Sequence, residues 1–295
     1  MVSTITNKGL NLALHRTFST NPTQSAVCKF QVGIASRTPS ITDTSLVQVI
    51  PFNTTTFNSC DTTIGWTKRG NADDVIVLSS AGSFKEGTGC LTLPTNASGS
   101  SSWYRTFTSA NYDSRHFYIY YYNSNVTTNL QNVSNSVSVT LGNNSTNSNA
   151  NTYEFNRSEF DNGWNVMTFY TPTVSTITGT CTLSAITYAD ITVLTNNSNV
   201  SNNQRMDYWN HCATSDLTNT FVSGYPNFDT SSRKVTNRGF LNSLQGNSFL
   251  VKEWGMVNSD STQILYCRDN SSSGISKTDD DEFAFIWVDT VSQQT

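Results

Sequence analysis

Three histidines carry the only imidazole groups of the chain, and no nucleophile motif accompanies them. His15, His116 and His211 lie far apart in the sequence, and none stands in a Gly-x-Ser-x-Gly setting or a comparable one. A hydrolytic serine or cysteine needs such a base beside it. We therefore predict no Ser/His/Asp or Cys/His site.

The densest acidic cluster is the run of four carboxylates at 279–282. A glycosidase places two carboxyl groups on either side of the scissile bond, and neighbours in sequence do not achieve this. We interpret the run as a solvated turn, with a cation site or a contact to a basic partner as alternatives. The Glu-x-Asp-x-x-Glu pattern of sandwich-fold glycosidases is absent, so we predict a protein without enzymatic activity.

Six scattered cysteines form no Cys-x-x-Cys pair, which excludes zinc-ribbon and thioredoxin spacing. We expect free thiols, and a disulfide between Cys90 and Cys181 remains open because both lie in strand-like segments. Asp190 and Glu86 are the acids that would suit a structural Ca²⁺. Their signal is too weak for a prediction, so we predict no metal and no cofactor.

Aromatic side chains are the remaining candidates for binding chemistry. Flat rings stack on the C–H faces of sugars, and arginine hydrogen-bonds to sugar hydroxyls. On a strand whose core face is Phe117, Ile119 and Tyr121, the alternate tyrosines point outward. The candidate ligand-binding residues, for a glycan or a protein partner, are Trp103, Tyr104, Arg105, Tyr118, Tyr120 and Tyr122. The alternative role of these residues is core packing or subunit contact.

The composition favours β-structure. Of the 295 residues, 36% are hydrophobic and 12% aromatic, which excludes disorder, and only 13% are charged. Asn, Ser and Thr replace the charges, and these residues disfavour helices. A net charge of −4 argues against nucleic-acid binding, and no run of about 18 apolar residues predicts membrane insertion. The first residues lack the pattern of a secretory signal, so we expect synthesis in a cytoplasm.

One helix and many strands are expected to position these residues. Leu10, Leu14 and Phe18 recur at a spacing of four and predict a helix within 4–18, capped by Thr6 or Asn7. Strands at intervals of 10–20 residues separated by polar turns predict a sandwich or jelly roll. The last strand, at 283–288, is apolar on both faces, so we expect it to be covered on both sides.

The fold class predicted from these patterns is all-β, with a β-rich base domain that carries one short N-terminal helix. Residues 1–56 and 210–295 would form this base domain. Residues 57–209 would form a β-sandwich or jelly roll inserted into one of its loops, since exposed loops tolerate insertions.

The predicted insert resembles concanavalin-like sandwiches and carbohydrate-binding modules. The resemblance rests on GWT at 65–67, FKEGTGCLTL at 84–93, FDNGWN at 160–165 and ADITV at 189–193. In such folds one short glycine-containing element opens a strand and a Gly-Trp element begins another. The resemblance implies a β-sandwich more than it implies a function.

The flanks resemble surface-exposed structural proteins of tailed bacteriophages, of the tail-fibre, collar or capsid-decoration type. The resemblance rests on ITNKGL at 5–10, FQVGIASRTPSITDTSL at 30–46, VKEWGMV at 251–257 and ILYCR at 264–268. It implies a virion protein that is assembled in the host cytoplasm. Its partners would be other virion proteins, further copies of itself in a homo-oligomer, and a cell-surface glycan.

Three hypotheses on function follow from this sequence. The first is a non-catalytic structural component of a phage virion whose sandwich contacts a subunit or a glycan. The second is a stand-alone glycan-binding lectin or adhesin. The third is a carbohydrate-active enzyme, which turnover on polysaccharides would reveal.

Overall fold

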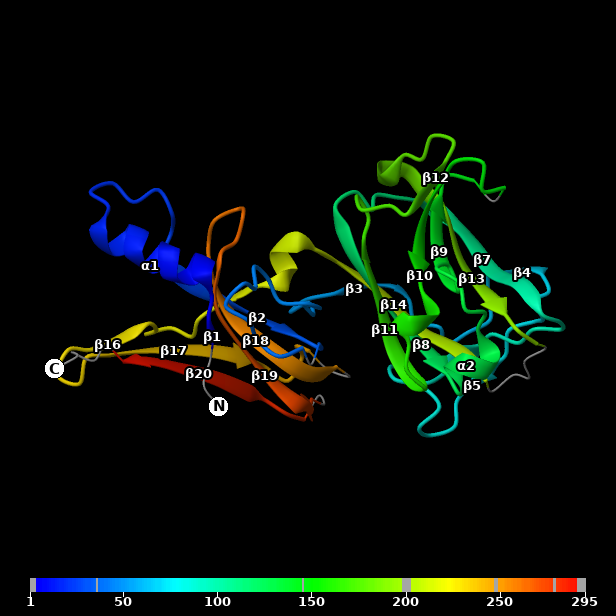
Figure 1. The fold of residues 1–295 in the computed structure, drawn as a ribbon. Coiled ribbons are helices and arrows are strands. Elements are labelled where there is room, and N and C mark those ends of the chain that lie inside the picture. Colours follow the sequence, from blue (N-terminus) through cyan, green and yellow to red (C-terminus); the bar gives the residue numbers. More distant parts are fainter. Residues whose placement is uncertain are drawn as a thin grey trace. The chain divides into compact units, whose positions relative to one another are not determined.

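The chain forms two compact units that are rich in β-strands (Figure 1). A computed structural model describes residues 4–35, 37–144, 146–197, 203–246, 249–277 and 280–290. Unit 1 combines residues 1–54 and 215–295, and unit 2 spans Thr55–Thr214. The compact unit Thr55–Thr214 supports the predicted insert at 57–209. That this insert folds by itself stays a prediction.

Unit 2 consists of two six-stranded sheets that face each other, with the short helix α2 and the 3₁₀ turns Arg157–Glu159 and Leu183–Ala185. Sheet B has the order β11-β8-β14-β6-β5, with β3 paired to β14, and sheet C has the order β12-β10-β9-β13-β7-β4. The elements are β3 (Thr55–Asn58), β4 (Trp66–Gly70), β5 (Val77–Leu78), β6 (Cys90–Thr92), β7 (Gly99–Ala110), β8 (Arg115–Asn123), α2 (Val126–Asn129), β9 (Val137–Gly142), β10 (Ala150–Phe155), β11 (Gly163–Tyr170), β12 (Thr176–Thr178), β13 (Ile186–Thr195) and β14 (Gln204–Ala213).

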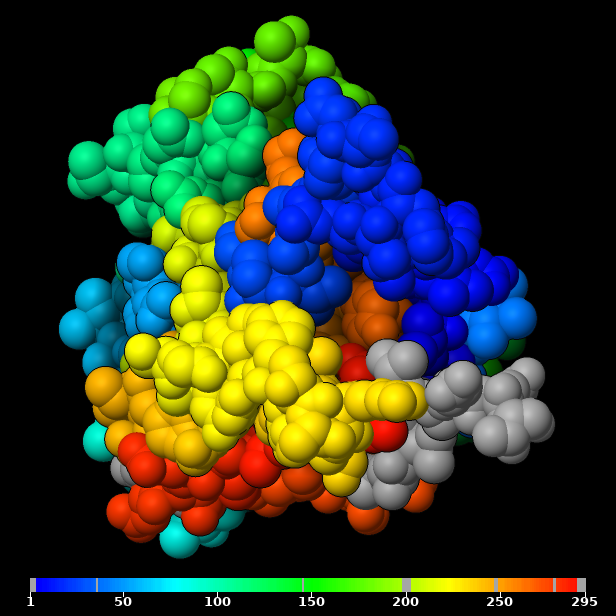
Figure 2. All heavy atoms as spheres, turned by 90° about the vertical axis from the view of Figure 1, so that its left-hand side faces the viewer, coloured from blue at the N-terminus to red at the C-terminus, as the bar shows by residue number. Residues whose placement is uncertain are grey.

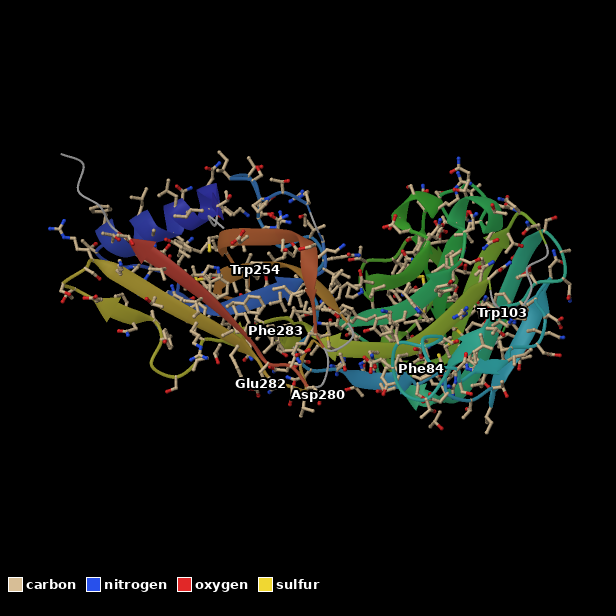
Figure 3. All side chains as sticks on the ribbon, turned by 90° about the horizontal axis from the view of Figure 1, so that it is seen from below. Phe84, Trp103, Trp254, Asp280, Glu282 and Phe283 are labelled. Carbon is tan, nitrogen blue, oxygen red and sulfur yellow. The ribbon has the colours of Figure 1, made fainter. Side chains whose placement is uncertain are left out.

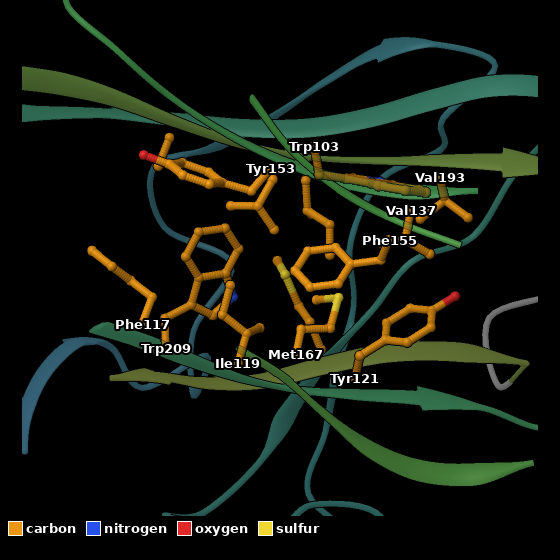
Figure 4. Close-up of a cluster of buried hydrophobic side chains, with 14 of the residues drawn as sticks. Trp103, Phe117, Ile119, Tyr121, Val137, Tyr153, Phe155, Met167, Val193 and Trp209 are labelled. Atoms are coloured by element: carbon orange, nitrogen blue, oxygen red, sulfur yellow. The ribbon is translucent and has the colours of Figure 1, made fainter. Parts of the chain in front are cut away.

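The core of unit 2 lies between these two sheets (Figure 4). Alternate residues of each strand point into it, because side chains of a strand alternate between its faces. Phe117, Ile119 and Tyr121 of β8 are fully buried, which confirms them as the core face. Their neighbours across the core include Val137 and Val139 of β9. The architecture is a β-sandwich, and the predicted all-β class is confirmed.

Unit 1 contains a five-stranded sheet, β1-β19-β18-β2-β15, and a three-stranded sheet, β16-β17-β20. The elements are β1 (Thr4–Ile5), α1 (Asn7–Phe18), β2 (Val27–Gly33), β15 (Asn219–Thr220), β16 (Asn227–Asp229), β17 (Lys234–Leu241), β18 (Leu250–Asn258), β19 (Leu265–Ser276) and β20 (Phe283–Thr290). The Phe30 ring lies at the centre of the core, within 6.4 Å of the rings of Phe52, Phe221, Phe285 and Trp287. A Cβ at Gly239 would come within 2.8 Å of the Phe30 ring, so β17 needs glycine where it crosses that ring.

A buried ion network fixes the long loop between β2 and β3. Arg268 of β19 is fully buried and contacts Glu253 at 2.8 Å and Asp43 at 2.7 Å. Glu253 also accepts hydrogen bonds from the backbone N–H groups of Val47 and Gln48, at 3.0 and 2.9 Å. These bonds satisfy charges that would be costly to bury alone, and they hold the loop against β18.

Helix α1 packs through a narrow face, and its apolar stripe lies on the opposite side of the helix. Thr6 caps the helix by accepting a hydrogen bond from the N–H of Gly9 at 2.9 Å, as one of the two expected caps. Gly9 and Leu12 are the buried helix residues. The stripe that predicted the helix, Leu10, Leu14 and Phe18, faces solvent with exposed fractions of 53%, 47% and 78%.

The expectation that the last strand is covered on both sides is wrong. β20 pairs with β17 alone among the described strands, so it lies at a sheet edge. Phe285 and Trp287 point into the core, whereas Ile286 and Val288 are 61% and 53% exposed on the other face. An apolar pattern on both faces therefore does not show that both faces are covered within one chain.

The cysteines are free thiols, so the disulfide between Cys90 and Cys181 does not form. Cys90 lies on β6 of sheet B, and Cys181 lies just before β13 and contacts the carbonyl of Leu141 in sheet C. Within the ranges that the structure describes, no helix is both long and apolar enough to cross a bilayer.

Candidate functional site

The outer face of sheet C carries a cross-strand row of polar and aromatic residues. Antiparallel register aligns Thr67 of β4, Tyr104 of β7, Asp190 of β13, Thr140 of β9 and Thr152 of β10. Their strand neighbours, such as Ile191 and Val139, point into the core, so the row points away from it. We call this surface the Asp190 face.

Asp190 is a buried carboxylate on this outer face, with an exposed fraction of 1%. The hydroxyl of Tyr188 donates to one carboxylate oxygen at 2.7 Å, and the hydroxyl of Thr192 donates to the other at 2.7 Å. Burial raises the pKa of Asp190, and the two hydroxyl bonds and the charge of Arg69 partly oppose that rise. The hydroxyls of Thr192 and Ser102 lie 2.6 Å apart, which extends the network to β7.

Two tyrosine rings and a guanidinium lie beside Asp190. The ring centroids of Tyr104 and Tyr188 are 5.5 Å apart, and the guanidinium of Arg69 lies 4.7 Å from the Tyr104 centroid. Tyr104 is half-buried and Arg69 is exposed, so both reach the surface. Burial and the neighbouring Asp190 raise the pKa of Tyr188, which keeps its hydroxyl protonated as a donor.

Gly142 of β9 makes room for the Tyr188 ring. It is aligned with Tyr188, and a Cβ at this position would lie 3.4 Å from that ring and 3.3 Å from the Cβ of Ala150. The tightest contact of that Cβ would be with the carbonyl oxygen of Asn149, at 3.1 Å. The pairing register of the strands therefore determines which residues form the cross-strand row and places Gly142 beside the Tyr188 ring.

This arrangement suits a neutral polyhydroxylated ligand. The half-buried Tyr104 ring supplies apolar contact and the exposed Arg69 guanidinium donates hydrogen bonds, while the buried Asp190 carboxylate fixes Tyr188 and Thr192 beside them. Both oxygens of Asp190 are already bonded within the sheet, so its position is fixed before any ligand arrives. Preorganised polar groups lower the entropic cost of binding.

The six candidate residues predicted from sequence do not form one site. Tyr104 alone lies on the Asp190 face. Trp103 is buried in the core at 1% exposure, where its indole N–H donates to the carbonyl of Asp73 at 2.9 Å, so a ligand role for it is wrong (Figure 4). Arg105 lies on the same side of β7 as Trp103, with its guanidinium 5.8 Å from the Trp66 ring.

The expected exposed row of tyrosines on β8 is also wrong. Tyr118 and Tyr120 do point away from the core of the sandwich, on the outer face of sheet B, but each is only 3% exposed. Tyr122 is half-buried, 5.3 Å from the Trp164 ring and with the Arg205 guanidinium 4.3 Å from its centroid. Direction along a strand was predicted correctly, whereas burial depends on loops that pack over the sheet.

The residues that sequence reasoning missed are Arg69, Tyr188 and Thr192. The signal for Tyr188 and Thr192 is present in the sequence of β13, where they alternate with apolar residues, whereas Arg69 lies on β4 and has no such signal. A polar face on an otherwise apolar strand indicates an outward polar surface. A single acid on a strand resembles a calcium ligand as much as a sugar contact, so the sequence alone does not assign Asp190 to a binding face.

A second buried carboxylate holds the loop that precedes β6. Asp207 of β14 accepts hydrogen bonds from the N–H groups of Lys85 and Glu86 at 2.7 and 3.0 Å, and burial raises its pKa to about 7. Asp61 accepts from the N–H of Thr88 at 2.7 Å. Across the residues described, no group of three or more His, Cys, Asp or Glu side chains lies close enough to hold a metal ion.

The chain matches no protein family model and no curated protein. Solved structures to which the chain is similar include the family 11 carbohydrate-binding module of a cellulosomal cellulase of Clostridium thermocellum, at 9% identity and a TM-score of 0.37, covering 55% of this chain and 95% of that one. The C-terminal family 22 carbohydrate-binding module of Xyn10B from the same organism is 13% identical, with a TM-score of 0.28, over 57% and 96% of the two chains.

The glycoside hydrolase domain of Endo-D from Streptococcus pneumoniae is also similar, at 9% identity and a TM-score of 0.32, over 75% of this chain and 36% of that one. At these TM-scores we draw no conclusion on ligand or site from the likeness. The proposals below rest on the geometry of the Asp190 face and of unit 1.

Proposed function

We propose that unit 2 binds a glycan on the Asp190 face and performs no reaction on it. The observation that carries this proposal is the buried carboxylate of Asp190 on the outer side of a sheet, fixed by Tyr188 and Thr192 beside the half-buried Tyr104 ring and the exposed Arg69. A fully buried aspartate is rare unless its carboxylate is paired, and the pairing of Asp190 with Tyr188 and Thr192 orders the polar residues of this face.

A non-catalytic role fits the arrangement of Asp190. Hydrolysis of a glycosidic bond requires two carboxyl groups that flank it, one as an acid and one as a base or nucleophile. Asp190 is 1% exposed and both of its oxygens accept hydrogen bonds from its own strand, so it orders the binding face and is not placed to transfer a proton to a ligand. The hypothesis of a carbohydrate-active enzyme is tested by the same experiment.

The experiment is a glycan array followed by isothermal titration calorimetry with the best ligand. We expect Tyr104→Ala and Arg69→Ala each to weaken binding at least about tenfold, since each removes roughly 1.5 kcal/mol or more of contact. Tyr122→Ala is the matched control, because Tyr122 is a half-buried tyrosine with an arginine over its ring on the other sheet. Equal binding by all variants contradicts the proposal, and turnover of the ligand contradicts the non-catalytic part.

The role in a virion and the location there stay predictions. They rest on the resemblance of the flanking segments to phage surface proteins, and no observation on the structure bears on them. Glycan binding by unit 2 is compatible with a virion protein and with a stand-alone adhesin. Purified virions of the source phage that lack the protein would eliminate the first of these.

A further inference from the structure

Helix α1 presents an apolar surface that nothing in the described chain covers. The helix stripe, which we define as Leu10, Leu14 and Phe18, lies opposite the packing face formed by Gly9 and Leu12. Three large apolar side chains in one row, 47–78% exposed, exceed the scattered single residues that are normal on a surface.

A second uncovered apolar surface lies on β20. The strand face, which we define as Ala284, Ile286 and Val288, is exposed along the side of β20 that points away from the core. It continues into a groove of about 810 Å³ along the free edge of the strand, whose lining includes Ile5 and Trp254. A sheet normally buries such a face under a helix or a second sheet.

The two surfaces match in length. Leu10 and Phe18 are eight residues apart, which is about 12 Å along a helix at 1.5 Å per residue. Ala284 and Val288 are four residues apart, which is about 13 Å along a strand at roughly 3.3 Å per residue. A helix laid along β20 would place one stripe residue near each residue of the strand face.

The charges around the two surfaces are opposite. Helix α1 carries Lys8 and Arg16 and no acid, whereas residues 280–282 at the start of β20 are all acids; Arg238 of β17, aligned with Ile286, is a base beside the strand face. Asp280 and Glu282 are exposed at the start of β20 (Figure 3). Such complementarity favours a partner whose helix is apolar and basic, and α1 of another copy has both properties.

We propose that the helix stripe of one copy packs on the strand face of a second copy. Within unit 1 the two surfaces lie on different sides, with α1 above and β20 below in Figures 1 and 2, so one copy does not cover its own strand face. The contact is heterologous, because different patches meet, and it builds a ring or an open chain rather than a closed two-fold dimer. The proposal is independent of the glycan site.

The test is a complementation experiment with the full chain. One variant carries Leu14→Ser and Phe18→Ser, and the other carries Ile286→Thr and Val288→Thr. Light scattering after gel filtration should show assemblies larger than a monomer for the unchanged protein and monomers for each variant. An equimolar mixture should give a heterodimer and nothing larger, because only one intact helix stripe and one intact strand face can meet.

Several outcomes overturn the proposal. A monomeric unchanged protein at high concentration does so, and so does a mixture of the variants that stays monomeric. Loss of assembly in the strand variant alone would indicate pairing along the free edge of β20 instead. Ile177→Ser is the matched control, since Ile177 is 65% exposed on β12 of unit 2 and should not change the mass.

Folding and charge are checked in parallel. Phe18 is the last helix residue and 78% exposed, so Phe18→Ser alone keeps the fold and should still weaken assembly at least about tenfold. Circular dichroism and the melting temperature verify this. Added salt should weaken assembly by screening the opposite charges, and assembly that strengthens with salt contradicts the electrostatic part.

Discussion

Asp190 and Asp207 show how two buried carboxylates on neighbouring strands in sequence serve different ends. Asp190 is bonded by the side-chain hydroxyls of Tyr188 and Thr192, so it orders the residues of the Asp190 face. Asp207 is bonded by the backbone N–H groups of Lys85 and Glu86, so it organises a loop. The chemistry of a carboxylate therefore follows from its hydrogen-bond donors, which only the fold specifies.

The raised pKa of Asp207 predicts a dependence of stability on pH. The unfolded chain ionises this group near pH 4, whereas the folded protein holds its proton until about pH 7. Between these values the unfolded state gains stability relative to the folded state, so the contribution of Asp207 to folding stability falls as pH rises from 4 to 7. Urea unfolding should show this decline, on the order of a few kcal/mol, in the unchanged protein.

The variant Asp207→Asn separates this effect from other titrating groups. Its amide oxygen can still accept from the loop, but the side chain does not ionise. The difference in stability between the unchanged protein and the variant should therefore move in favour of the variant as pH rises. A difference that is constant from pH 4 to 8 contradicts the assignment.

The buried network of Arg268 predicts a large loss of stability on substitution. Arg268→Met leaves the buried Glu253 carboxylate without its cation and leaves Asp43 paired with Arg37 alone, which costs about 3–5 kcal/mol. Lys68→Met removes an exposed pair with Asp73 and should cost less than about 1 kcal/mol. Calorimetry of both variants checks the contrast, and similar losses would show that burial does not decide the effect.

At the level of elements, the helix illustrates how a pattern can predict an element and misplace it. The stripe at spacing four correctly predicted a helix, since the period belongs to the backbone. The face of the helix that packs is determined instead by a close contact between the helix and the backbone of β19. A Cβ at Gly9 would lie 2.1 Å from the carbonyl oxygen of Tyr266. Glycine in a helix costs about 1 kcal/mol of propensity, and here it permits contact with β19.

This close approach predicts that Gly9→Ala destabilises the protein. Alanine improves helix propensity by about 1 kcal/mol, but its methyl group collides with the backbone of Tyr266, and overpacking costs about 1–3 kcal/mol or more. We expect a lower melting temperature for unit 1. Asn11→Ala, at an exposed position of the same helix, should leave it unchanged or raise it.

At the level of the whole molecule, the ends of unit 2 meet in sheet B. Thr55 of β3 is paired with His211 of β14, so the chain enters and leaves unit 2 side by side. Such an arrangement is what permits a domain to lie within a loop of another. The core of unit 2 is also closed on itself, between sheets B and C.

We therefore expect residues 55–214 to fold when produced alone. The isolated segment should show a single cooperative thermal transition and the same glycan affinity as the full chain. Residues 1–54 joined to 215–295 by a short Gly-Ser linker should melt separately and should retain the assembly that we propose for unit 1. An unfolded 55–214 segment would contradict the division into domains.

The sequence by itself determined the all-β class, the helix at its N-terminus and the core face of β8. These features follow from local periodicity and composition, which the backbone geometry of strands and helices translates directly. It also gave Tyr104 as a candidate ligand-binding residue, because an aromatic residue next to an arginine can be recognised in the sequence.

Only the tertiary structure decided which aromatic residues reach the surface and which carboxylate lies in the candidate binding face. Trp103 and Tyr104 are adjacent in sequence, yet the pleat buries one and leaves the other beside Arg69. Asp190 meets Tyr104 through the pairing of β13 with β7, over a separation of 86 residues. Burial and cross-strand neighbours depend on sheet order and on loops over the sheets, and neither leaves a local trace in the sequence.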